Sequence, residues 1–182
     1  MGSLKGKLLV AGADLFDPHF RRAVVLVTEH DEDGALGLVL NRPAETTVTE
    51  AVPGLAPLVA EDAPVFVGGP VDQHAVLVVA EFDDPDDSAS TIFGDVGFVR
   101  GDSDIELAAE RTRRARVFAG YAGWSAGQLD AELAADGWIV VPAQREDVFG
   151  DEDDELWSSV LRRQGRSDFA LLATMPVDPS LN

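Results

Sequence analysis

The chain has 182 residues, and its 14 Lys and Arg residues against 33 Asp and Glu residues give a net charge of −19. This length fits a single domain, whose usual size is roughly 100–200 residues. A surface this acidic repels nucleic-acid phosphates and anionic membranes, so direct binding to either is not expected. The chain has no cysteine, which excludes a disulfide framework and a thiolate metal site and fits a reducing compartment.

The apolar runs of the sequence are short. Residues 24–27 and 76–80 have the length of strands, well below the ~20 residues that a membrane-spanning helix needs. No targeting segment is recognised, and we therefore expect a cytoplasmic protein.

The first half of the sequence predicts mainly strands. Residues 7–11 form a short apolar run. Residues 23–30 and 35–41 form two β-branched-rich runs, separated by an acidic turn that ends in Gly34, which is a hairpin signal. Pro43 lacks an amide donor and ends the second of these runs. The pattern then predicts a short helix over residues 47–55 and strands over residues 64–67 and 75–82.

The second half combines strands with more helices. The acidic loop 83–88 is expected to face solvent, and residues 92–100 are expected to hold one or two strands. The predicted elements that follow are a helix over 103–111 capped by Ser103, a strand over 116–122, a helix over 126–135, a strand over 138–141 and a helix over 155–164. Residues 169–174 fit either a helix or a strand, and the tail 175–182 is expected to be extended. Early hairpins followed by late helices indicate an α+β fold with a mixed or antiparallel sheet.

A run of arginines precedes the strand predicted at 116–122. It consists of Arg111, Arg113, Arg114 and Arg116. We interpret it as a solvated helix end that leads into the strand, because charge runs usually face water. The alternative, a patch for nucleic acid, conflicts with the net charge of the chain.

The segment from Gly123 to Gly127 matches the G-x-S-x-G pattern of a serine-hydrolase nucleophile turn. In that fold the histidine follows the serine, whereas all three histidines here precede Ser125, and no glycine-rich oxyanion motif is visible. Ser125 and Gln128 also form a capping-box pattern. We therefore predict that Ser125 caps a helix and that the sequence holds no complete catalytic set.

Glu29 and His30 close a strand beside the acidic turn, and two interpretations remain open. They are an acid–base pair, because histidine titrates near neutrality, or His30 is simply hydrogen-bonded at the mouth of the hairpin. A metal site is not expected, because no second histidine lies at ligand spacing and the HEXXH pattern is absent. No cofactor motif is visible.

Two short motifs each end an apolar strand and give the most suggestive candidate site. Asn41 and Arg42 precede a proline, and Arg42 offers a guanidinium fork for a carboxylate or phosphate. Gly68 and Gly69 offer successive amides that can line an anion site. In the alternative interpretation Arg42 ties loop carbonyls together and the glycines permit a tight turn. Further along, Tyr121 and Trp124 would supply an aromatic wall, although packing in the core is the commoner role of such residues.

Taken in order, these pieces resemble the YqgE/AlgH family of bacterial proteins. The matching stretches are GKLLVA at 6–11, DPHFRRAVVLVTEH at 17–30, GALGLVLNRP at 34–43, VFVGGPV at 65–71, FAGYAGWSAGQLDAEL at 118–133, and a helix near Trp157. The resemblance spans nearly the whole chain. It implies a single α+β domain over residues 1–182, with a mixed, largely antiparallel bifurcated sheet that curls towards a pseudo-barrel between flanking helices.

The resemblance assigns no catalytic residue and no cofactor. Its motif positions suggest a site without roles; they are Asn41, Arg42, Gly68, Gly69, Tyr121, Gly123, Trp124 and Gln128. The family carries a transcriptional-regulator label without a recognisable DNA-binding module, and no helix-turn-helix pattern is present in this sequence.

We therefore expect a non-enzymatic binding or regulatory protein, acting on an unknown protein partner or on an anionic small molecule. The expected ligand-binding residues are Asn41, Arg42, Gly68, Gly69, Tyr121, Trp124 and His30. The alternative is a hydrolase or transferase for an anionic small molecule, with Glu29 or His30 as base and Arg42 as anion clamp, which requires His30 to lie near Arg42. A DNA-binding regulator is the third hypothesis, and the net charge disfavours it.

Overall fold

The computed structural model describes residues 2–13, 15, 17–151 and 153–174, and the tail predicted at 175–182 lies outside these ranges. The strands are β1 (Lys7–Ala11), β2 (Val24–Asp31), β3 (Gly34–Val39), β4 (Pro43–Thr47), β5 (Pro64–Val67), β6 (Val71–Phe82), β7 (Ser90–Phe93), β8 (Val96–Phe98), β9 (Thr112–Ser125) and β10 (Trp138–Pro142). The helices are α1 (Val48–Ala51), α2 (Ile105–Arg111), α3 (Gln128–Ala134), α4 (Arg145–Phe149), α5 (Leu156–Arg163) and α6 (Ser167–Thr174), with short 3₁₀ turns η1 (Pro53–Leu58), η2 (Pro85–Asp87) and η3 (Asp153–Glu155).

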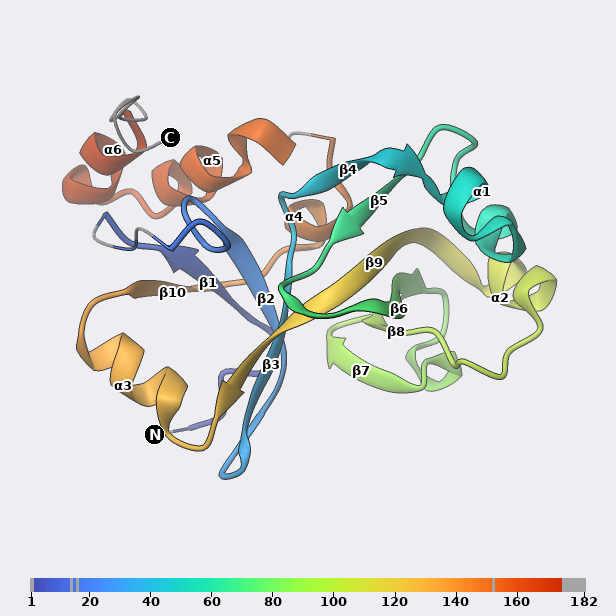
Figure 1. Ribbon diagram of the computed structural model, residues 1–182, viewed down its shortest axis with the longest axis horizontal. Helices are drawn as coiled ribbons and strands as arrows, with labels where there is room; N and C mark the ends of the chain where they lie inside the picture. The colour runs from blue at the N-terminus through green and yellow to red at the C-terminus, as the bar shows by residue number, and fades with distance from the viewer. Residues whose placement is uncertain (1, 14, 16, 152, 175–182) are drawn as a thin grey trace.

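The long strand β9 belongs to both arms of a forked sheet (Figure 1). Its C-terminal part pairs with β3, and the sheet continues through β2 and β1 to β10. Its N-terminal and middle parts pair with β6 on one side, leading to β8 and β7, and with β5 on the other, leading to β4. The pairing of β5 with β9 is parallel, and the other pairs are antiparallel. The predicted α+β class with a mixed, largely antiparallel, curled sheet is confirmed.

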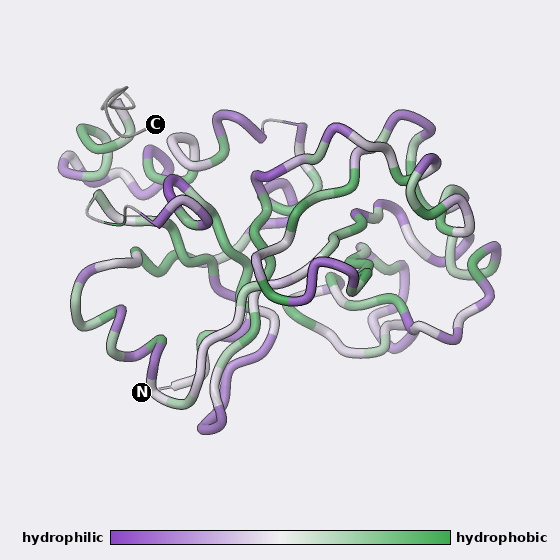
Figure 2. The backbone as a smooth tube through the Cα atoms, in the orientation of Figure 1, coloured by the Kyte–Doolittle hydropathy of each residue, from purple (hydrophilic) through white to green (hydrophobic). Residues whose placement is uncertain are grey.

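The hairpin of β2 and β3 forms where the sequence predicts it. Asp31 pairs with Gly34 at the turn, and Asp31 Oδ1 accepts a hydrogen bond from the amide of Asp33 at 2.9 Å. The first five residues of β2 are buried, as expected for an apolar strand covered on both faces. Figure 2 shows this contrast, with hydrophobic central strands and a hydrophilic hairpin tip.

The main core lies against β1, β2 and β3 and is closed by the C-terminal helices. Leu8, Leu9 and Leu26 are fully buried there. Helix α5 packs onto β1, and the indole Nε1 of Trp157 donates to the carbonyl oxygen of Ala11 at 2.9 Å. This hydrogen bond satisfies the indole N–H of Trp157, as the burial of that side chain requires.

Several predicted boundaries differ from the structure. The strand predicted at 116–122 extends over residues 112–125 as β9, and so includes most of the arginine run. Helix α2 is capped by Asp104 and not by Ser103, because the Asp104 carboxylate accepts the amides of Glu106 and Leu107. Strand β4 and helix α4 are not anticipated by the sequence patterns. Pro43 starts β4, an edge position at which its missing amide is tolerated.

Candidate functional site

Asn41 and Arg42 both bond to the neighbouring backbone. The Asn41 side chain accepts the amide of Val24 at 3.0 Å and donates to the carbonyl of Arg22 at 2.9 Å. The Arg42 guanidinium donates to the carbonyls of Arg21 and Asn41. Burial lowers the pKa of Arg42 from its ordinary value. This is the structural interpretation of the motif, in which Arg42 ties loop carbonyls together.

Gly68 and Gly69 lie where the two arms of the sheet separate. The amide of Gly68 donates to Ala119 of β9 at 2.9 Å, and its carbonyl accepts the amide of Val39 at 2.8 Å. A Cβ atom on Gly69 would overlap the backbone carbonyl of Tyr121. A Cβ atom on Gly120, which has φ of +75°, would lie 2.6 Å from the carbonyl oxygen of Gly69. These glycines therefore permit two chain segments to cross in direct backbone contact.

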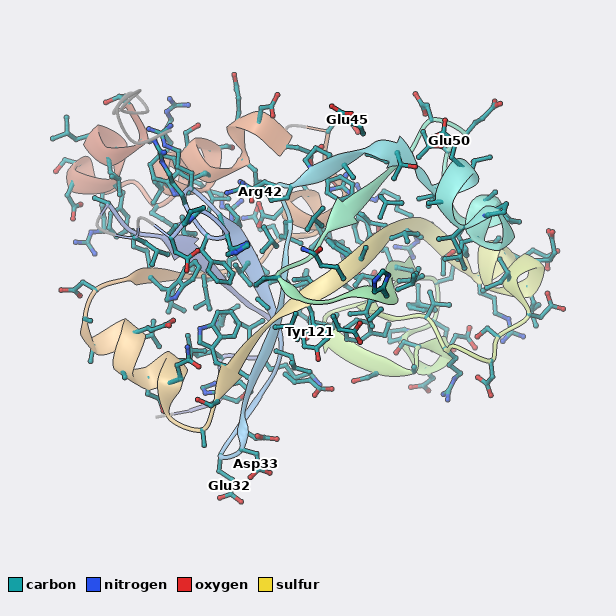
Figure 3. All side chains as sticks on the ribbon, in the orientation of Figure 1. Glu32, Asp33, Arg42, Glu45, Glu50 and Tyr121 are labelled. Atoms are coloured by element: carbon teal, nitrogen blue, oxygen red, sulfur yellow. The ribbon has the colours of Figure 1, made fainter. Side chains whose placement is uncertain are left out.

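His30 lies at the far end of the hairpin from Arg42. It pairs with Ala35 beside the turn, and its Nδ1 accepts the amide of Leu4 at 3.0 Å. His30 is six residue steps along β2 from Val24, whose carbonyl accepts the amide of Leu40 near Arg42, so roughly 20 Å of strand lies between the two ends. Figure 3 shows Arg42 at one end of the hairpin and Glu32 and Asp33 at the other. The hydrolase or transferase hypothesis requires His30 to lie near Arg42, and the structure does not meet this requirement.

Tyr121 and Trp124 lie on opposite faces of β9, because residues three apart in a strand point to opposite sides. Trp124 is buried beside Phe20 and Trp138, with ring centroids 6.3 and 6.2 Å away. Tyr121 is half-buried near the centre of the fork (Figure 3). The prediction that Tyr121 and Trp124 form one aromatic wall is therefore wrong. Of the two residues, Tyr121 faces an open cavity.

Glu132 of α3 accepts hydrogen bonds from two indole groups. Its Oε2 lies 2.8 Å from Nε1 of Trp124 and 3.0 Å from Nε1 of Trp138. We expect Glu132→Ala to lower the free energy of unfolding by about 2–3 kcal/mol, because two largely buried donors lose their acceptor. Urea unfolding followed by circular dichroism measures the loss. Glu132→Gln keeps one acceptor oxygen and should lose less; equal losses in the two variants would contradict this role.

The arginine run is held in ion pairs. The expectation of a solvated helix end is wrong for Arg114 and Arg116 of β9, whose side chains are 35% and 11% exposed, whereas Arg111 and Arg113 remain more than half exposed. Arg113 and Arg114 reach the buried carboxylate of Glu81 at 3.4 and 2.9 Å. Arg116 lies over the ring of Phe66 at 4.2 Å and pairs with Asp153 at 3.4 Å. Burial lowers the pKa of Arg116 and raises that of Asp153. These cations already have carboxylate partners inside the protein.

Ser125 is not the N-cap of α3, which begins after Gly127 in a left-handed conformation. Half of the predicted capping box is present: the Gln128 side-chain oxygen accepts the amide of Ser125 at 3.0 Å, and the Ser125 hydroxyl donates to the same oxygen at 3.2 Å. The other half is missing, because the backbone amide of Gln128 does not donate to the Ser125 hydroxyl. The side chains of Ser125 and Gln128 thus close the turn between β9 and α3.

The fork of the sheet holds an apolar cleft of about 690 Å³. Segments distant in sequence line it, among them Leu38 of β3, Leu55 of η1, Val76 of β6, Phe98 of β8, Ile105 of α2 and Tyr121 of β9. The polar groups on its lining include Glu29 and Arg100. Sites for small molecules commonly have volumes of roughly 300–1,000 Å³ and mainly apolar walls. The cleft therefore has the size and chemistry of a binding site.

An exposed apolar strip continues from the mouth of this cleft across three strands. It consists of Leu36, Gly123, Tyr121, Val71 and Val76, and we call it the fork strip. Leu36 is 37% exposed, Val71 39% and Val76 45%. Leu36 lies opposite Gly123 and Tyr121 opposite Val71 in the pairing register, which puts these side chains on one face. Sequence patterns mark Leu36 and Val76 only as strand residues; in the folded chain both line the cleft.

Among the residues that the structure describes, no group of three or more His, Asp or Glu side chains could hold a metal ion. Within the same ranges, no helix is long and apolar enough to cross a membrane.

The model of the AlgH-like family matches residues 8–168. The chain belongs to this family. It is 44% identical to a UPF0301 protein of Rhodococcus opacus over 97% of this chain and 90% of the relative. It is also 44% identical to a UPF0301 protein of Streptomyces avermitilis, over 100% of this chain and 97% of the relative.

Two solved structures share the fold. Protein DIP2367 of Corynebacterium diphtheriae is 28% identical, with a TM-score of 0.87 over 96% of this chain and 93% of that chain. The solution structure of the AlgH protein of Pseudomonas aeruginosa is 29% identical, with a TM-score of 0.73 over 97% of this chain and 96% of that chain. The resemblance deduced from the sequence motifs is confirmed.

Proposed function

We propose that this AlgH-like chain, as one unit in the cytoplasm, acts as a non-enzymatic binding protein whose ligand site is the cleft at the fork of the sheet. The cleft carries the proposal, because its lining is largely apolar and its mouth continues into side chains that remain exposed. Exposed apolar patches that adjoin a cavity commonly mark binding surfaces. A chain without cysteine supports the cytoplasmic location.

This proposal moves the ligand site away from the residues selected by sequence motifs. Of these residues Tyr121 lines the cleft, whereas Asn41, Arg42 and Gly68 bond to backbone groups and Trp124 lies on the opposite face. An anion site around Arg42 therefore gains no support from the geometry. Direct DNA binding gains none either, because the arginines of β9 are paired with carboxylates.

Binding of the neutral apolar dye Nile red tests the site. We expect saturable binding with enhanced fluorescence, and at least about tenfold weaker binding in Val76→Arg, where a long cation replaces an apolar side chain at the mouth of the cleft. Leu171→Arg is the matched control, because Leu171 is a 69% exposed leucine on α6 outside the cleft lining. Equal dye affinity in the two variants would refute the assignment of the site.

A further inference from the structure

Gly123 has no role in the fold that requires a glycine. A Cβ atom there would lie 3.8 Å from Val71 Cγ2 and 3.9 Å from the Tyr121 ring. Both are ordinary van der Waals distances. Its φ lies outside the left-handed region, unlike that of Gly120 three residues earlier. A glycine in a strand also weakens the strand and often marks a place where another backbone or ligand approaches closely.

Gly123 therefore leaves a gap in the middle of the fork strip. It separates Leu36, opposite it on β3, from Tyr121 and Val71 on the other side. Gly123 itself is exposed, and of the apolar side chains around it Leu36 and Val71 are exposed and Tyr121 is half-buried. This is the shape of a shallow seat whose floor is backbone and whose walls are Leu36, Val71 and Tyr121.

The fork strip fits one helix in width. Strands β3, β9 and β6 are consecutive in the sheet, and two strand spacings give about 10 Å. An α-helix with its side chains measures about 10–12 Å across. The strip is a face of already paired strands, so it offers few backbone hydrogen bonds to an added strand. A partner that satisfies its own backbone, as a helix does, suits such a face.

Acidic side chains flank the fork strip and the cleft. Glu29 lies opposite Leu36 in the register, and Asp104 and Glu106 stand on either side of Ile105 of the cleft lining. All three carboxylates belong to exposed residues. Arg100 is the opposing cation on the cleft lining. With a net charge of −19, the protein attracts cationic partners and repels a second copy of itself.

We propose that the fork strip is the docking surface for a basic amphipathic helix of a partner protein, with the apolar face of the helix seated over Gly123 and its cations beside Glu29. This inference rests on the proposed function and specifies the class of partner. Amphipathic helices bind apolar grooves through side chains spaced along one face.

The test uses fluorescence anisotropy of a labelled Leu/Lys amphipathic helix of about 15 residues, which spans roughly 22 Å. The comparison peptides are a Leu/Glu version with the same pattern and a scrambled Leu/Lys version with no apolar face. We expect the amphipathic basic peptide to bind, the acidic version to show no binding, and the scrambled version to bind at least about tenfold more weakly. Equal binding of the scrambled peptide would reduce the effect to general charge attraction and overturn the proposal.

Two variants locate the binding. Gly123→Val fills the seat and Leu36→Ser removes one wall, and each should weaken the basic peptide at least about tenfold. Leu171→Ser on α6 is the control and should bind as the wild type does. Circular dichroism and urea midpoints show whether the variants fold. If Gly123→Val does not fold, Gly123→Ala replaces it, because it adds a smaller side chain at an unstrained position. Unchanged peptide affinity in the folded Gly123 variant would overturn the proposal.

Sedimentation of the wild type alone tests whether a second copy of this chain occupies the strip instead of a helix. Self-association that Gly123→Val abolishes would identify a second copy on the strip and also overturn the proposal. Nile red separates this inference from the function on which it rests. Saturable dye binding that Val76→Arg weakens, without peptide binding, leaves the cleft as a binding site and removes only the helix as its partner.

Discussion

Gly69→Ala is expected to lower the free energy of unfolding by about 3–5 kcal/mol. The added Cβ atom would overlap backbone atoms of Tyr121, and backbone cannot move aside as the end of a flexible side chain can. The two arms of the sheet separate at this crossing, so the strain would spread to the pairing of β9 with both β3 and β6. The midpoint of urea unfolding, followed by tryptophan fluorescence, measures the loss.

Gly123→Ala is the matched control for this prediction. Its Cβ atom meets only ordinary van der Waals contacts, and an alanine restricts the unfolded chain more than a glycine does. We therefore expect a change between zero and a gain of about 1 kcal/mol. Similar losses at positions 69 and 123 would show that the crossing tolerates a side chain and that the steric argument fails.

Asp147→Ala is expected to cost about 3 kcal/mol of the free energy of unfolding. Asp147 is 4% exposed, and its two carboxylate oxygens bind the Arg163 guanidinium at 2.6 and 2.9 Å. It also accepts the amide of Gln144 at 2.7 Å, at the start of α4. Removal of this buried carboxylate leaves the Arg163 guanidinium and the amide at the start of α4 without their shared partner. Urea unfolding of the variant gives the measurement.

The pair of Asp168 and Arg166 provides a comparison near the same end of the chain. It has a similar N–O distance of 2.7 Å, but both side chains are more than half exposed. Exposed ion pairs contribute little because water screens them. Asp168→Ala should therefore leave the urea midpoint unchanged within error. A loss as large as that of Asp147→Ala would mean that burial does not decide the strength of these pairs.

The strands were the most predictable part of the fold. Apolar, β-branched runs locate β1, β2 and β5 to within one residue, and the acidic turn ending in Gly34 locates the hairpin. The first residues of β9 were not predicted as strand, because a run of arginines indicates a solvated segment. Their role depends on carboxylates such as Glu81 and Glu146 that the fold brings near. Strand β4 pairs along an edge and lacks an apolar run, so no local pattern identifies it.

The candidate site was predictable only in one residue, Tyr121. The motifs with glycine, arginine and asparagine proved to serve the crossing and its loops, where backbone groups need partners and space. The spacing of Tyr121 and Trp124 already indicated opposite faces, given a strand at this position. The cleft joins segments from residue 28 to residue 121, and such long-range register cannot be deduced from one sequence.

The sharing of β9 by both arms of the sheet has a consequence for synthesis of the chain. Residues 112–125 emerge from the ribosome after β3 and β6 have been made, and both of those strands pair with β9. The early strands must therefore wait with unpaired edges and exposed apolar surface, a state that favours aggregation. Contacts between distant segments also slow folding. The acidic charge of the nascent chain repels its neighbours during that interval and so protects it.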